Sequence, residues 1–204
     1  MTVEAELPSW SGAAHARNLA SAAMRMTYRL RAHGAHHVGT SGPLLMVTRS
    51  EGLLVGAILH ASAPRPIHVL ANEAMTTGFP TAVLMRAGDI PVTLPTAIEA
   101  QRVAVAALRD ERAVVVAGDS VPVGYLVGVT GVNVMPVVLL GADGRVPTDP
   151  PRPRSRIDVY FAPAVPVSVP GDPLRASTRA AIAEQVRQIV SDAEDLAAMR
   201  SGRM

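Results

Sequence analysis

The residues of this chain best suited to chemistry lie around position 50. Ser50 and Glu51 follow the apolar run 44–48 after one arginine, and Gly52 comes next. A serine that follows an apolar strand, with a glycine two residues later, is similar to the turn that exposes a nucleophilic serine. In hydrolases with that turn, the catalytic residues come in the chain order serine, then acid, then histidine. In this chain no histidine follows position 68. The sequence therefore does not favour a serine hydrolase.

The composition excludes several other kinds of chemistry. The 204 residues contain no cysteine, and all nineteen basic residues are arginine. Disulfides, thiolate nucleophiles and cysteine metal sites are therefore absent, as are a lysine Schiff base and a phosphate-loop lysine. With two phenylalanines, three tyrosines and one tryptophan, the chain lacks the aromatic side chains on which single-stranded nucleic acid stacks.

From residue 43 onward, short apolar runs alternate with stretches of helical period, which is typical of α/β architecture. Strands are expected at 44–48, 67–71, 113–117, 132–140 and 157–161, and helices at 53–61, 77–87, 96–111, 121–130 and 172–199. Asp172 is expected to cap the last helix, with Pro173 at its first position. The predicted fold class is α/β, with a central mixed β-sheet flanked by helices.

The chain is expected to form a single domain over residues 1–204, because a chain of this size buries one core. It divides into an N-terminal helical segment, 1–32, and an α/β core, 43–199. A helix is expected over 12–31, with Leu19, Met26 and Leu30 on one face. Such a helix either covers the core or lies on a membrane surface, and both alternatives stay open here.

The N-terminal residues predict a cytoplasmic location, because Glu4 and Glu6 are present and no basic stretch precedes an apolar run. Association with a membrane surface is the open alternative. Residues 120–142 carry no charge and are numerous enough to consider a transmembrane helix. Pro122 and Pro136 interrupt this stretch, so a buried helix followed by a buried strand is expected instead.

The segment 42–56 resembles the first motif of the glycerolipid acyltransferase family, of the lysophosphatidate acyltransferase type. In that family an apolar strand runs into Asn-His-x-Ser/Gly-x-x-Asp. Here Arg49 takes the Asn position, Ser50 the His position and Val55 the Asp position. The resemblance implies a histidine that deprotonates an acceptor hydroxyl as it attacks an acyl thioester, and an aspartate that orients the ring. Serine and valine can do neither, so the catalytic pair is absent.

Other motifs of the family keep their framework and lose their charged residues. Gly88-Asp89-Ile90-Pro91-Val92 resembles the family's Gly-x-Ile-Pro-Val, but Thr93 and Leu94 replace the pair whose arginine would hold the substrate phosphate. The motif Phe-Pro-Glu-Gly-Thr-Arg falls on residues 117–122, where only Asp119 keeps the chemical character of the family. The apolar strand 134–141, with Pro136 inside it, is well kept.

This pattern of losses predicts a catalytically inactive acyltransferase-like protein. It would bind a lipid or an acyl chain, or act as a regulator or scaffold in phospholipid metabolism. The alternative is an active 1-acylglycerol-3-phosphate-type acyltransferase with a non-standard site. The replaced or degenerate catalytic positions are Arg49, Ser50, Val55 and Asp119, and the expected ligand cleft contains Ser50, Glu51, Leu54, Val55, Ile58 and Asp119. Ser50 is expected at the start of the following helix, in a cleft of apolar character.

The expected partners are a lipid or acyl chain, a protein partner or second copy of the chain, and a membrane surface contacted peripherally. Arg152, Arg154 and Arg156 form a basic patch that suits lipid phosphates or an acidic partner. Nucleic acid is the weaker alternative for this patch, because the net charge is only +2, and it is not among the expected partners.

No metal and no cofactor are predicted. His33, His36 and His37 cluster in the sequence, but no further ligand can be named for a metal ion. His68 is expected to be a strand residue whose ring is satisfied by hydrogen bonds.

Overall fold

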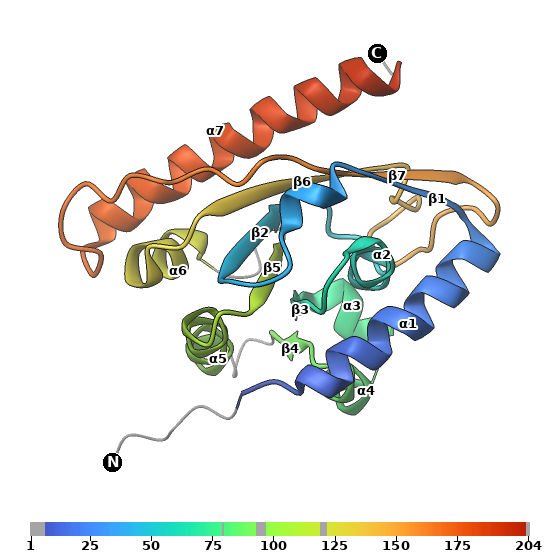
Figure 1. Cartoon of the computed structure of the whole chain (residues 1–204), viewed down its shortest axis with the longest axis horizontal. Helices are drawn as coiled ribbons and strands as arrows, with labels where there is room; N and C mark the ends of the chain where they lie inside the picture. Colours follow the sequence, from blue (N-terminus) through green and yellow to red (C-terminus); the bar gives the residue numbers. More distant parts are fainter. Residues whose placement is uncertain (1–6, 79, 93–96, 119–121, 203–204) are drawn as a thin grey trace.

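A computed structural model gives the structure of the chain and describes residues 7–78, 80–92, 97–118 and 122–202. In this part of the chain seven strands form one sheet, in the order β1-β7-β6-β2-β5-β3-β4 (Figure 1). The strand pairs are parallel, with the exception of β6 and β7, which are antiparallel. The predicted single α/β domain with a mixed sheet flanked by helices is confirmed.

The bounds of the elements follow the sequence pattern closely in the middle of the sheet. The strands are β1 (Arg29–His33), β2 (Leu44–Thr48), β3 (His68–Ala71), β4 (Ile90–Pro91), β5 (Ala113–Ala117), β6 (Val134–Leu140) and β7 (Arg156–Phe161). The helices are α1 (Trp10–Thr27), α2 (Val55–Ser62), α3 (Glu73–Gly78), α4 (Thr81–Arg86), α5 (Ala97–Arg109), α6 (Val123–Thr130) and α7 (Ala176–Ser201), with a 3-10 turn η1 (Ala35–Val38) between β1 and β2. Strands β2 and β5 match the expected ranges residue for residue.

The central strands are buried along their whole length because helices cover both faces of the sheet. Every residue of β2 and β5 is buried. Met46 packs in the core cluster that contains residues of α2, whereas Leu45 and Val47 pack in the cluster that contains residues of α5, α6 and α7. Continuous apolar strands of this kind are typical of parallel sheets covered on two sides.

The helix expected over 12–31 is wrong at its end, since α1 stops at Thr27 and β1 follows. Strand β1 pairs in parallel with β7 at the edge of the sheet. Leu30 packs against the core, while the alternating Arg29 and Arg31 are exposed, so the period of two reflects an edge strand with one covered face.

Helix α1 packs on α2 and thereby covers the core. The guanidinium of Arg17 donates to the Pro64 carbonyl at 2.7 Å, and the Ser21 hydroxyl donates to the Ala61 carbonyl at 3.2 Å. The expected shared apolar face is wrong in part, because Leu19 is 75% exposed and Met26 is 87% exposed. These two side chains point away from the core.

Two further expectations need correction. The single helix expected at 77–87 is instead two short helices, α3 and α4. Asp172 does not cap α7: its carboxylate accepts a hydrogen bond from the Leu174 amide at 2.9 Å, in a turn that precedes the helix. Arg175 stands at the N-cap, and α7 begins at Ala176.

The uncharged stretch 120–142 contains α6 and β6, as expected, and both elements contribute buried side chains to the core. Across the described ranges, the helices are either too short or too polar to cross a lipid bilayer.

Candidate functional site

The candidate site follows from the direction in which the chain leaves two neighbouring strands. After β2 the chain enters α2, whose Val55 and Ile58 pack in one core cluster. After β5 it enters α6, whose Leu126 and Val127 pack in the other cluster, on the opposite face of the sheet. Ligands of α/β sheets bind in the crevice that such a divergence opens at the carboxyl ends of the strands. The expected crevice therefore lies where β2 and β5 end.

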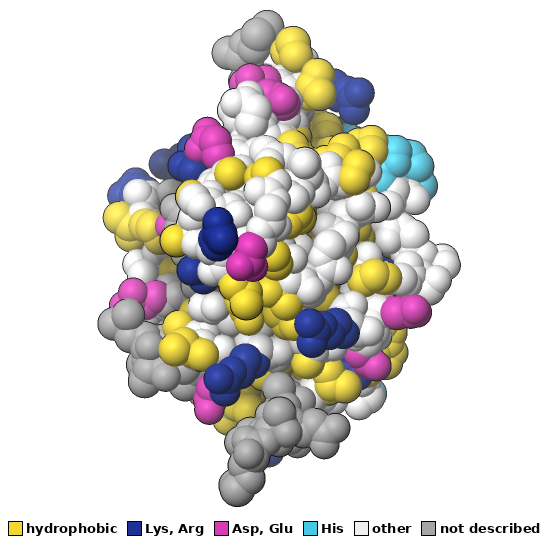
Figure 2. Space-filling model, turned by 90° about the vertical axis from the view of Figure 1, so that its left-hand side faces the viewer, with side chains coloured by type: hydrophobic (Ala, Val, Ile, Leu, Met, Phe, Trp, Pro, Cys, Tyr) yellow, Lys and Arg dark blue, Asp and Glu magenta, His cyan; other side chains and the backbone are white. Residues whose placement is uncertain are grey.

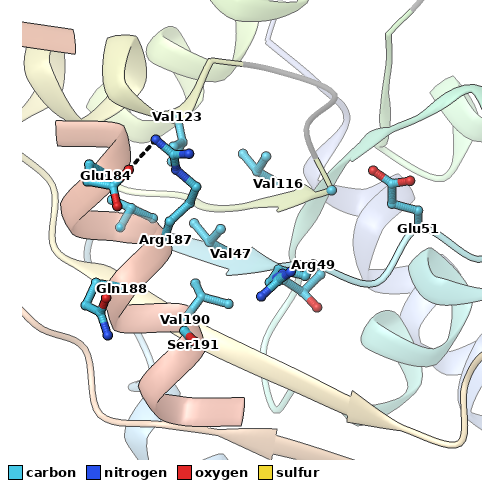
Figure 3. A pocket seen from close by; sticks show the side chains of 13 residues that line it. Val47, Arg49, Glu51, Val116, Val123, Glu184, Arg187, Gln188, Val190 and Ser191 are labelled. Carbon is cyan, nitrogen blue, oxygen red and sulfur yellow. Dashed lines mark ion pairs between the residues drawn. The ribbon is translucent and has the colours of Figure 1, made fainter. Parts of the chain in front are cut away.

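A hollow of about 510 Å³ lies at this position, which is within the roughly 300–1,000 Å³ that ligand pockets usually occupy. Val47 of β2 and Val116 of β5 lie between its two sides, with α7 on one side and Glu51 on the other (Figure 3). The lining residues are Val47, Thr48, Arg49, Glu51, Val116, Gly118, Val123, Glu184, Val186, Arg187, Gln188, Val190 and Ser191.

Glu51 and Gly118 hold together the two loops that leave the strands. The Gly118 amide donates to the Thr48 carbonyl at 2.8 Å, and Gly118 has a φ of +61°. A Cβ atom at this position would overlap the Glu51 carboxylate. Position 118 thus favours glycine for its backbone conformation, and any larger residue there would displace the Glu51 side chain. The Asn72 side-chain amide donates to the Glu51 carbonyl at 3.2 Å, which fixes the loop from the other side.

Helix α7 forms the side of the first hollow opposite Glu51, and its residues take part in two ion pairs. Arg49 reaches across from the end of β2 to Glu194 at 3.1 Å, and Arg187 contacts Glu184 at 2.6 Å along the helix. A second hollow of about 660 Å³ shares Arg49 and Glu51 with the first and extends along β6. Because Arg49 lines both hollows, its ion pair with Glu194 lies between them.

The charges of the two hollows do not suit a phosphate group. Their described lining contains three arginines and five acidic residues: Arg49, Arg145 and Arg187 against Glu51, Asp143, Glu184, Glu194 and Asp195. An excess of carboxylates repels the negative charge of a phosphate group bound in the same crevice. The valines at the centre of the first hollow offer apolar contact instead.

The structure separates the residues that the sequence grouped in one cleft. Ser50 is half-buried in the loop between β2 and α2, five residues before the helix begins, so its expected place at the helix start is wrong. Val55 and Ile58 are fully buried in the core, and Leu54 packs against that core. None of these three lines either hollow, so the expected apolar cleft built on them is also wrong.

Ser50 and Glu51 line the second hollow together with Arg49, and their role as ligand-binding residues stays a prediction. Asp119, Thr93 and Leu94 lie outside the described residues.

The sequence reasoning missed the wall that α7 contributes. Its polar side chains in the crevice recur once per helical turn, at Glu184, Arg187 with Gln188, Ser191 and Glu194. This stripe runs beside the buried positions Ile182, Val186 and Val190. Polar residues with the same period as a buried stripe were the available signal, but they are also typical of any solvated helix face.

A buried polar network lies outside the crevice, in the part of the sheet next to α1 and α4. His60 Nε2 is 2.8 Å from Asp89 Oδ1, and His68 Nδ1 donates to the Gly88 carbonyl at 2.7 Å. His68 is a strand residue, as expected, but its ring is only half satisfied, since Nε2 has no hydrogen-bond partner among the described residues. Burial lowers the pKa of His68, so the ring is neutral.

Of the comparisons with known proteins, only the comparison of structures gave a match. Neither the models of protein families nor the curated proteins gave a match to the sequence. The structure is similar to the crystal structure of the 1-acyl-sn-glycerophosphate (LPA) acyltransferase PlsC from Thermotoga maritima, with a TM-score of 0.65. This chain has the fold of that acyltransferase. The match covers 90% of this chain and 78% of the PlsC chain, at 16% sequence identity.

The acyltransferase-like fold that the sequence motifs predicted is therefore confirmed. At this level of identity the similarity to PlsC establishes the fold alone. The assignment of single residues to motif positions, including the replaced catalytic pair, stays a prediction.

Proposed function

We propose that this acyltransferase-fold protein binds a lipid or an acyl chain in the crevice and does not transfer acyl groups by the histidine–aspartate route. The observation that supports the proposal is the environment of the two replaced positions. Ser50 lies in a loop, and a serine hydroxyl is not basic enough to remove a proton from an acceptor near neutral pH. Val55 is fully buried in the core, so it neither reaches the crevice nor could orient a base there.

The missing base has a quantitative consequence. A positioned general base contributes roughly 10²- to 10⁴-fold to the rate of such a reaction. Without it, and with an acidic crevice that disfavours a phosphate-bearing acceptor, turnover of lysophosphatidate should be at least roughly 10²- to 10⁴-fold slower than in an enzyme that has the base. The protein would then act through binding, as a regulator or scaffold in phospholipid metabolism.

The binding part of the proposal rests on the interior of the crevice. Five valines line the first hollow: Val47, Val116, Val123, Val186 and Val190. These valines offer contact to an apolar ligand, and the other lining residues apart from Gly118 are polar or charged. The polar lining residues are Thr48, Gln188 and Ser191, together with the charged Arg49, Glu51, Glu184 and Arg187.

Native mass spectrometry of the purified full-length chain tests this binding role. We expect a retained lipid or fatty acid in the natural protein and its loss in Val123→Arg, which places a large cation in the first hollow. Val83→Arg is the matched control, because Val83 is 51% exposed on α4 and lines neither hollow. Absence of any bound lipid from the natural protein, even after incubation with phospholipid or fatty acid, would contradict the proposal.

An acyl-transfer assay addresses the alternative of an active enzyme with a non-standard site. Glu51 is the observation in favour of that alternative, since it is a carboxylate that lines both hollows. With acyl-CoA or acylated carrier protein as donor and lysophosphatidate as acceptor, we expect no transfer above the protein-free reaction. Robust turnover that Glu51→Gln abolishes would replace the binding role with catalysis.

A further inference from the structure

Six exposed arginines gather at one edge of the molecule. They are Arg25 in the last turn of α1, Arg29 and Arg31 in β1, Arg152 and Arg154 in the loop before β7, and Arg156 at the start of β7. We call this set the basic edge. The sequence shows Arg152, Arg154 and Arg156 as one half of the set, and the fold brings the other half, Arg25, Arg29 and Arg31, next to it.

Backbone hydrogen bonds fix the two halves against each other. The Arg154 amide donates to the Thr27 carbonyl at 2.7 Å, and the Arg29 amide donates to the Ser155 carbonyl at 2.9 Å. In the pairing of β1 with β7, Arg29 lies opposite Arg156. The end of α1, the start of β1 and the start of β7 accordingly meet at the right-hand side of Figure 1. The basic edge is therefore part of the folded scaffold.

Most of these cations have no acidic partner in the part of the chain that the structure describes. Within the described residues, the ion pairs include Arg156, which contacts the buried Asp158 at 2.7 Å, and none of the other five arginines. Burial alone would raise the pKa of Asp158, but hydrogen bonds from His33 and Arg156 hold this pKa below its ordinary value. The opposite end of the molecule differs, since Figure 2 shows positive and negative side chains interspersed there.

Apolar side chains accompany the basic edge. Met26 follows Arg25 directly and is 87% exposed, and Leu19 lies two turns earlier on α1 at 75% exposed. Helix α1 contains no acidic residue. Exposed apolar side chains beside unpaired arginines suit the boundary between headgroups and acyl chains, where the arginines meet lipid phosphates.

A chain of hollows leads from the crevice to this edge. A third hollow of about 610 Å³ is lined by Arg152 and Ser155 of the edge loop. It shares Asp143, Gly144 and Arg145 with the second hollow, which in turn shares Arg49 and Glu51 with the first. Neighbouring hollows thus lie along the surface between the candidate site and the basic edge.

We infer that the basic edge docks on the surface of a bilayer that contains anionic phospholipid. Docking there places the outermost hollow next to the headgroups and the crevice further along the same surface. A nucleic-acid backbone would also attract the arginines, but it offers no place for the exposed Met26 and Leu19. The inference does not depend on what the crevice binds.

Co-sedimentation of the full-length protein with vesicles tests the inference. We expect binding to vesicles of phosphatidylglycerol mixed with phosphatidylcholine, little binding to phosphatidylcholine alone, and release at high salt. The triple variant Arg25→Gln, Arg152→Gln, Arg154→Gln should bind about 100-fold more weakly, given the usual contribution of each arginine near an anionic surface. The triple variant Arg86→Gln, Arg102→Gln, Arg109→Gln changes the net charge equally with exposed residues of α4 and α5, and it should bind within a few-fold of the natural protein.

Three outcomes would overturn the inference. The first is no binding to anionic vesicles at low salt, and the second is an equal loss of binding in the two triple variants. The third is tighter binding to a DNA duplex than to vesicles at equal concentrations of phosphate, which would assign the basic edge to nucleic acid. Circular dichroism of both variants verifies that they are folded before the comparison is made.

Discussion

His60 Nε2 lies 2.8 Å from Asp89 Oδ1, with both side chains buried, so a helix and the turn before an edge strand are joined by one polar contact. The same carboxylate oxygen accepts the Val69 amide of β3 at 3.1 Å. Asp89 therefore connects α2, β3 and the approach to β4. This explains why an acidic residue stands within the apolar segment Gly88-Asp89-Ile90-Pro91-Val92, and the explanation is structural.

Replacement of Asp89 should destabilise the fold strongly. Asp89→Ala leaves the Val69 amide and the His60 ring buried without their partner, at a cost of about 2–4 kcal/mol in the free energy of unfolding. Urea denaturation of the variant and the natural protein measures the difference. Asp110→Ala serves as the control, because Asp110 is half exposed and its ion pair with Arg112 should contribute less than about 1 kcal/mol. Similar losses in both variants would show that the buried contact stabilises the fold no more than the exposed ion pair does.

The stability of the protein should fall as the pH drops below about 6.5, in part because of His68. Burial lowers the pKa of His68 in the folded state, so below the ordinary pKa the unfolded chain binds a proton that the folded chain does not. Gly88, Asp89, His60, Arg112 and the Trp10 ring face this histidine. The contribution is therefore complete above the unfolded pKa and is lost toward acid.

His68→Asn isolates this contribution. The asparagine amide can still donate to the Gly88 carbonyl, but it cannot be protonated. Between about pH 7.5 and about pH 5, the urea midpoint should fall less for the variant than for the natural protein. An identical pH dependence of the two proteins would mean that His68 does not contribute.

Restoring the motif residues should not restore acyl transfer. In Ser50→His with Val55→Asp, the new aspartate would lie at a position with no solvent exposure, where an unpaired carboxylate costs about 3 kcal/mol or more. We expect reduced stability by urea denaturation and no turnover of lysophosphatidate. Ser50→His alone, in the half-buried loop, should unfold at nearly the same urea concentration as the natural protein. A stable and active double variant would refute our description of position 55.

The contact between Gly118 and Glu51 can be measured with a pair of glycine substitutions. Gly118 and Gly131 have nearly the same φ, +61° and +63°, but a Cβ atom at Gly131 would meet nothing within 4 Å. Both alanine variants should lose about 1–2 kcal/mol from the backbone conformation, and Gly118→Ala should lose more because it displaces Glu51. In a Glu51→Ala background the excess should disappear. Equal losses at both positions would argue against the contact.

The central strands could be predicted from the sequence because burial on two faces leaves an uninterrupted apolar run. Strand β1 could not be predicted for the opposite reason: only one of its faces is covered, so Arg29 and Arg31 continue the polar side of the preceding helical pattern. Their alternation with Leu30 was the available signal, but at the end of a helical pattern a period of two over five residues is weak.

The candidate site was predicted only at its first strand. The motif places Val55 in the crevice only if the helix begins at Ser50. In the structure a loop follows Ser50, α2 begins at Val55, and this residue lies in the core. The wall from α7 could not be predicted, because sequence periodicity shows which side of a helix is buried but not which strand ends it faces.

The buried polar network and the crevice occupy different parts of the sheet. His60, Asp89 and His68 hold the scaffold beside α1 and α4, whereas Thr48, Glu51 and the polar stripe of α7 surround the crevice. No residue belongs to both groups. Substitutions at the polar crevice positions of α7, which lie outside both the network and the core clusters, can accordingly alter which molecule is bound while the protein remains folded.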